Sequence, residues 1–174
     1  MKIMKSNGRE SNFNPSKITK RIKDQSLGLS VDADKLSIKI ISQMADGMTS
    51  LAIDNLCIEG AAMMVVNHPD YSTLAARIFV TSLRKRTPDK FSDAVTQLEK
   101  ETKQLGEEFV KYVNENSIEL DKIIKDERDF NHDIFGLKTL ERSYLLRGEK
   151  PNKIDIGEVV ERPQYMWMRT AIEV

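Results

Sequence analysis

The chain has 174 residues, enough for one domain or for one small domain with an appended segment. Its 27 basic and 27 acidic side chains cancel, which argues against a global field that draws it to nucleic acid or to an anionic membrane. A single cysteine, Cys57, excludes an intrachain disulfide and a zinc site built from several thiolates. With no apolar run near the length of a membrane span and no secretory signal, the expected location is cytoplasmic.

The N-terminal residues predict a β-hairpin that leads into a helix. Residues 2–5 and 9–13 flank Ser6-Asn7-Gly8, and Asn-Gly supplies the positive φ angles of a tight hairpin turn. Asn14 followed by Pro15 predicts a helix N-cap and a first-turn proline. Since a two-stranded hairpin is marginally stable alone, we expect it to lie on helices as a cap.

The next segment predicts two helices with recognisable ends. Asp32 or Asp34 opens the first of them, and Gly47 closes it. Thr49 or Ser50 caps the second, which carries its apolar residues on one stripe.

A further helix is expected over residues 69–86, which makes four helices under the β cap. The small residues Gly60, Ala61 and Ala62 on the preceding helix allow a neighbour to approach closely. We therefore expect tight antiparallel packing between that helix and the helix at 69–86.

The second half of the chain stays helical in pattern, with no internal repeat. Helices are predicted over 89–103, 106–114, 117–125 and 137–146. A loop is expected over 148–157, and then a short strand over 158–161. Pro163 marks the start of a final apolar segment, which has no helix stop signal and is expected to be an incomplete structural element.

Basic residues are concentrated near the N-terminus. The first 23 residues hold seven Lys or Arg side chains against one acid: Lys2, Lys5, Arg9, Lys17, Lys20, Arg21 and Lys23 against Glu10. This pattern suits a phosphate-bearing ligand, but on charge alone a solvated basic face is the favoured interpretation. The chain contains neither a P-loop nor a Gly-x-Gly-x-x-Gly fingerprint.

No residue pattern predicts catalysis or a metal site. Cys57 lies on an apolar helical stripe, which is typical of a buried core thiol. His68 and His132 are isolated, with no nucleophile elbow and no paired metal spacing. The acids of residues 126–129 are expected to form a salt-linked helix end.

Several motifs resemble one known family. Residues 135–146, FGLKTLERSYLL, and 161–169, ERPQYMWMR, are similar to segments of the large, catalytic subunit of class I ribonucleotide reductase. Residues 4–8 and 13–18 resemble the opening of the ATP-cone, an allosteric nucleotide-binding module found at the start of many such subunits. Residues 68–77, HPDYSTLAAR, resemble the helix that closes the cone.

The resemblance implies a mainly α fold in two parts. Residues 1–90 would form a four-helix ATP-cone with a small N-terminal β-hairpin cap. Residues 91–174 would form the helical N-terminal region of the reductase large subunit, with a short strand leading into a catalytic barrel that the chain lacks. Because that chemistry needs several cysteines and the chain has one, we expect no activity from the chain alone.

The resemblance also implies an effector and its ligands. The effector is ATP or dATP, with or without Mg²⁺, and Lys5 and Lys85 would meet at its phosphates. The family's nucleotide-binding positions fall on Lys5, Ser6, Ser11, Asn14, Lys17, Ser50, Asp54 and Lys85. Ser6 replaces a cation and Ser11 a carboxylate of the family pattern, although a bulge would bring Glu10 inward to replace the latter.

Three functions remain open from the sequence. The first is the regulatory N-terminal portion of a ribonucleoside-diphosphate reductase large subunit, whose partners are the rest of that subunit, the small radical-generating subunit and further large subunits. The second is a stand-alone nucleotide sensor. The third is a structural module with an inert cone, in which an apolar surface docks the absent barrel: Leu140, Tyr144, Leu145, Tyr165, Trp167 and Met168.

Overall fold

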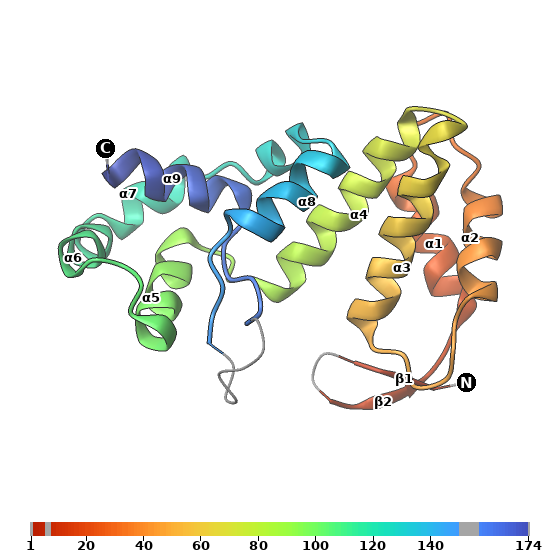
Figure 1. The fold of residues 1–174 in the computed structure, drawn as a ribbon, viewed down its shortest axis with the longest axis horizontal. Helices are drawn as coiled ribbons and strands as arrows, with labels where there is room; N and C mark the ends of the chain where they lie inside the picture. Colours follow the sequence, from red (N-terminus) through yellow and green to blue (C-terminus); the bar gives the residue numbers. More distant parts are fainter. Residues whose placement is uncertain (1, 6–7, 150–156, 174) are drawn as a thin grey trace. The chain divides into compact units, whose positions relative to one another are not determined.

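The computed structural model describes residues 2–5, 8–149 and 157–173 (Figure 1). Over these residues the chain is mainly helical, with one two-stranded antiparallel sheet near the N-terminus, which confirms the predicted fold class. Contacts divide it into two compact units, Met1–Ser82 and Leu83–Val174, and each is described by itself. Among the helices described, none has the length and apolar character needed to cross a membrane.

The first unit begins with the predicted hairpin. Strands β1 (Lys2–Met4) and β2 (Glu10–Asn12) pair antiparallel, with Ile3 opposite Ser11. At the turn, the Lys5 amide donates to the Arg9 carbonyl, and Gly8 adopts a positive φ of 74°. Ser6 and Asn7 lie outside the described residues.

The outer edge of β1 pairs with the segment that precedes the third helix. The Met4 amide donates to the Met48 carbonyl at 3.0 Å, and the Gly47 amide donates to the Lys2 carbonyl at 2.9 Å. Met4 and Thr49 form a parallel bridge. This pairing supplies the support that an isolated hairpin lacks.

Side-chain caps define the helix starts. Asn14 caps α1 (Pro15–Gln25) by accepting from the Ser16 amide, as predicted. Of the alternatives left open, Asp32 caps α2 (Ala33–Ser42) and Thr49 caps α3 (Ser50–Met63). Each accepts from the amide three residues later, which satisfies a donor with no partner inside its helix.

The rest of the first unit consists of the 3₁₀ turn η1 (Met64–Val66) and the first part of α4 (Asp70–Arg86). Ile22, Leu36, Ile40, Leu74 and Ile78 are fully buried at helical spacings and form the core. Two residues of the 68–77 motif, Tyr71 and Arg77, form hydrogen bonds to the backbone around the loop between α1 and α2. These contacts give both residues a structural role. The Tyr71 hydroxyl accepts from the Asp32 amide, and the Arg77 guanidinium donates to the Gln25 and Leu27 carbonyls.

Gly60 on α3 packs differently from the prediction. A Cβ atom placed on Gly60 would clash with Ile40 Cδ1 and lie 3.4 Å from Leu36 Cδ1, both on α2. The close approach at Gly60 is therefore to α2 and not, as predicted, to the helix at 69–86. The spacing of small residues marks a tight contact, but it does not say which helix makes it.

The second unit contains the end of α4 and further helices. These are α5 (Phe91–Thr102), α6 (Glu107–Glu115), α7 (Ser117–Ile123), the 3₁₀ helix η2 (Asp126–Asn131), α8 (Ile134–Ser143) and α9 (Pro163–Glu173). Phe91, Leu98, Val113 and Tyr165 lie in its core, and the Phe91 and Tyr165 rings pack edge to face at 5.9 Å.

The short strand expected over residues 158–161 is not formed. A single antiparallel bridge joins Val159 to Arg147. The ladder stops there because the Leu146 amide donates to the side-chain carboxylate of Glu161, at 2.8 Å, in place of a backbone carbonyl. Most of the loop expected over 148–157 lies outside the described residues.

Candidate functional site

The candidate site begins where the hairpin meets α3. Lys5 is exposed and follows Met4 directly, and Met4 is bridged to Thr49, the N-cap of α3. The Ser50 hydroxyl donates to the Met4 carbonyl at 3.2 Å. A lysine thus stands beside a helix start, whose backbone amides and dipole favour an anion.

Two predicted ligands lie at the start of α1. The Asn14 side-chain oxygen accepts from both the amide and the hydroxyl of Ser16, at 3.0 and 2.6 Å, so it is engaged as a cap. Lys17 is exposed in the first helical turn. Its ammonium group therefore places a positive charge at the start of α1, where the helix amides also favour an anion.

The strand register settles the question of Glu10. Ser11 pairs opposite Ile3 and Glu10 opposite Met4, so β2 is regular and the bulge that would bring Glu10 inward is absent from the described pairing. The Glu10 carboxylate instead accepts from the Lys2 ammonium at 2.8 Å. Ser6, the other departure from the family pattern, lies outside the described residues.

Asp54 has protein partners on both oxygens. Its Oδ1 accepts from Nη1 of Arg21 on α1, and its Oδ2 accepts from the hydroxyl of Ser82 on α4 at 2.7 Å. The residue is only 8% exposed. In this structure Asp54 therefore joins three helices, and each of its carboxylate oxygens already accepts from a protein donor.

Arg21 is the residue that sequence reasoning missed, because it was counted only as part of a basic surface. Burial lowers the pKa of its guanidinium. Its Nη2 atom is buried and has no hydrogen-bond partner among the described residues. The sequence feature that could have identified Arg21 is its position four residues after Lys17, on the same face of α1.

Cys57 follows Asp54 by one turn of α3 and is 1% exposed, which confirms the predicted buried thiol. Burial raises the pKa of this thiol to about 11, and the charge of Arg21 opposes that shift. A thiol in this environment is a poor nucleophile, because the thiolate is the reactive form.

Cys57 should report on the opening of the first unit. At pH 8, a disulfide reagent such as DTNB should label the native protein about a hundredfold more slowly than the urea-unfolded chain, whose thiol has a pKa near 8.5. Because the folded pKa is the higher one, the stability from the protonated thiol is complete below the unfolded pKa. It is lost as the pH rises toward 11. Equal labelling rates for native and unfolded protein at pH 8 would contradict the buried environment.

The remaining predicted ligand, Lys85, is exposed in the last turn of α4 and belongs to the second unit. Its meeting with Lys5 stays a prediction. Over the described residues, no group of three or more His, Cys, Asp or Glu side chains could hold a metal ion.

Comparison with known proteins assigns the first unit to a class. The ATP cone domain family matches residues 1–86, so the hairpin and its helices form an ATP-cone domain.

The whole chain is 40% identical to the ribonucleoside-diphosphate reductase large chain 2 of Saccharomyces cerevisiae. It is 38% identical to the large subunit of Arabidopsis thaliana and 37% identical to that of Vaccinia virus. Each alignment covers 100% of this chain but only 20%, 22% and 23% of the relative. The chain is therefore homologous over its full length to the N-terminal region of ribonucleoside-diphosphate reductase large subunits, and it spans about a fifth of their length.

Proposed function

We propose that this chain acts as the regulatory N-terminal portion of a ribonucleoside-diphosphate reductase large subunit and binds ATP or dATP through its first unit. The observation that carries the proposal is the ATP-cone match over residues 1–86, in a unit that presents Lys5 beside the start of α3 and Lys17 at the start of α1.

The chemistry of these positions fits a nucleoside triphosphate. Two ammonium groups and the backbone amides at helix starts suit phosphate oxygens, and charge-assisted hydrogen bonds of this kind contribute roughly 1.5–3 kcal/mol each. Ser11 lacks the carboxylate that the family pattern offers to a base, so discrimination between bases should be weak at this position.

Regulation would follow from differential affinity. Nucleotide occupancy of the cone changes subunit contacts only if the nucleotides bind two oligomeric states with different affinities. The partners in this proposal are the rest of the large subunit, further large subunits and the small radical-generating subunit. The complete assembly would reduce ribonucleotides to deoxyribonucleotides in the cytoplasm, and the chain alone would not, since its one thiol, Cys57, is buried.

Isothermal titration of the full chain with ATP and with dATP, in the presence and absence of Mg²⁺, tests the binding step. Both nucleotides are expected to bind, and Lys5→Ala should weaken affinity about tenfold or more, because it removes a charge-assisted bond. Lys35→Ala, at an exposed position on α2, is the matched control and should change affinity less than about twofold.

Absence of heat and of a thermal shift at millimolar nucleotide would overturn the proposal and leave the chain a structural role. Equal loss of affinity in the Lys5 and Lys35 variants would show that nucleotide binding depends on the net charge of the chain and not on Lys5 in particular.

A further inference from the structure

The last turn of α4 belongs to the cone by homology and to the second unit by contact. The family match extends to residue 86, whereas residues 83–86 pack with the second unit. Lys85, the predicted phosphate ligand, lies in this turn and is exposed, while its neighbours Arg84 and Arg86 are partly buried. Successive helical residues point about 100° apart, so the three side chains leave the helix in different directions.

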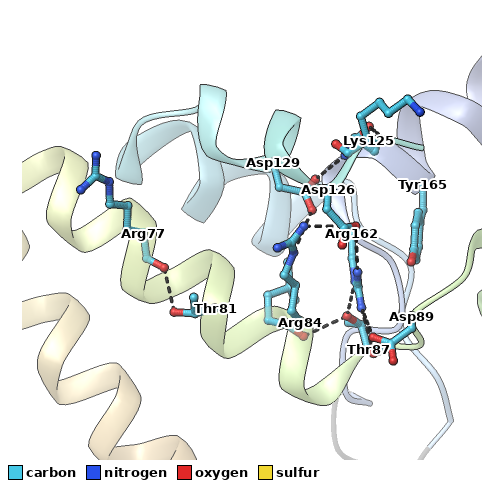
Figure 2. A network of polar contacts seen from close by, with 12 residues as sticks. Arg77, Thr81, Arg84, Thr87, Asp89, Lys125, Asp126, Asp129, Arg162 and Tyr165 are labelled. Carbon is cyan, nitrogen blue, oxygen red and sulfur yellow. Dashed lines mark hydrogen bonds and ion pairs between the residues drawn. The ribbon is translucent and has the colours of Figure 1, made fainter. Parts of the chain in front are cut away.

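Arg84 is held on one side of this turn. Its Nη2 lies 3.1 Å from Asp126 Oδ1, and its Nε lies 3.6 Å from Oδ2 of Asp129, which is 2% exposed. The guanidinium also stacks over the Phe130 ring, 5.3 Å from its centre. Figure 2 shows Arg84 directed from α4 toward Asp126 and Asp129 on η2.

Arg86 is held on another side. Its Nη2 donates to Glu141 Oε1 on α8 at 2.6 Å, and Lys138 approaches the other carboxylate oxygen at 3.3 Å. Burial alone would raise the pKa of Glu141, but the hydrogen bond from Arg86 and the charge of Lys138 outweigh it and lower that pKa. The carboxylate is therefore ionised and paired at neutral pH.

A third arginine fixes the chain just beyond the helix. Arg162 is 2% exposed; its Nε donates to the Thr87 hydroxyl and its Nη2 to Asp89 Oδ1, both at 2.9 Å. Its Nη1 lies 3.5 Å from Asp126, so one carboxylate faces both Arg84 and Arg162 (Figure 2). The segment on both sides of Lys85 is thus tied to η2, to α8 and to Arg162, the residue that precedes α9.

We propose that these ion pairs make Arg84 and Arg86 positioning residues for Lys85, so that phosphate binding by Lys85 depends on the second unit. The inference rests on the proposed function. A helical turn that is already fixed loses less conformational entropy when its lysine binds a ligand. The ligand therefore binds with higher affinity. By linkage, nucleotide bound at Lys85 stabilises the same ion pairs.

A double-mutant cycle measured by ATP titration of the full chain tests this dependence. Lys85→Ala should weaken ATP binding about tenfold in the otherwise unchanged chain. In the D126N/E141Q background, which removes a carboxylate partner of Arg84 and of Arg86, the same substitution should weaken binding by less than about threefold. Asp126→Asn alone provides a milder background, since the Asp126 side chain is 61% exposed.

The control background is E99Q/E127Q, which removes the same charge from exposed positions of the second unit and should keep the tenfold effect. Fluorescence of Trp167 on α9 verifies that each background is folded. An equal effect of Lys85→Ala in every background would overturn the positioning role, as would the absence of any effect in a chain that binds ATP. No ATP binding by the unmodified chain would instead overturn the proposed function itself.

Discussion

Replacing Arg162 with methionine is expected to lower the free energy of unfolding of the second unit by about 2–4 kcal/mol, because it leaves the buried hydroxyl and carbonyl oxygens of Thr87 without their donor. Arg162 is 2% exposed and donates to the hydroxyl of Thr87 and to Asp89. Its guanidinium also lies 5.4 Å from the centre of the Tyr165 ring. Methionine keeps much of the volume but satisfies none of these groups.

The single tryptophan of the chain, Trp167, lies on α9 of the second unit, so urea unfolding followed by its fluorescence measures this change locally. Arg162→Lys should recover little, since an ammonium cannot reproduce the planar fork that reaches Thr87 and Asp89 together. Arg142→Met, at an exposed position of α8, is the matched control, with an expected change within about 0.5 kcal/mol. A comparable loss in both methionine variants would contradict the assignment of stability to this network.

Asp54→Ala is expected to destabilise the first unit by about 2–4 kcal/mol, since it removes the carboxylate that pairs with the largely buried guanidinium of Arg21. Arg21 would then keep its charge at a site where burial already lowers its pKa. The Ser82 hydroxyl would lose its acceptor as well. The cost is below that of a fully buried pair, because the Arg21 side chain remains 22% exposed.

The labelling rate of Cys57, the single cysteine and a residue of α3, measures opening of the first unit directly. Asp54→Asn keeps an acceptor for Arg21 and should cost less than half as much as the alanine variant. The double variant R21M/D54L replaces the pair by apolar groups and should recover most of the lost stability. Unchanged labelling in Asp54→Ala would show that the Arg21 pair contributes nothing to the fold.

Local sequence patterns predicted much of the first unit. Asn-Gly at the turn and Asn14-Pro15 at the start of α1 correctly predicted the hairpin and the first helix, because turn and cap geometry depend on neighbouring residues. The helix partner of Gly60 was predicted wrongly, since a small residue permits close approach by any helix that packs on that face. The short strand at 158–161 was lost to the Glu161 side chain, whose acceptor competes with the backbone in a way no periodicity shows.

The amino-acid sequence by itself determined the helical class, the hairpin, the Asn14 cap of α1 and the family, since these follow from short-range patterns and from motifs that homologues share. Only the tertiary structure decided which charges are paired. Arg21 meets Asp54 across 33 positions, and Arg162 meets Thr87 across 75. Helix packing brings such residues together, and their distance in the sequence carries no trace of it.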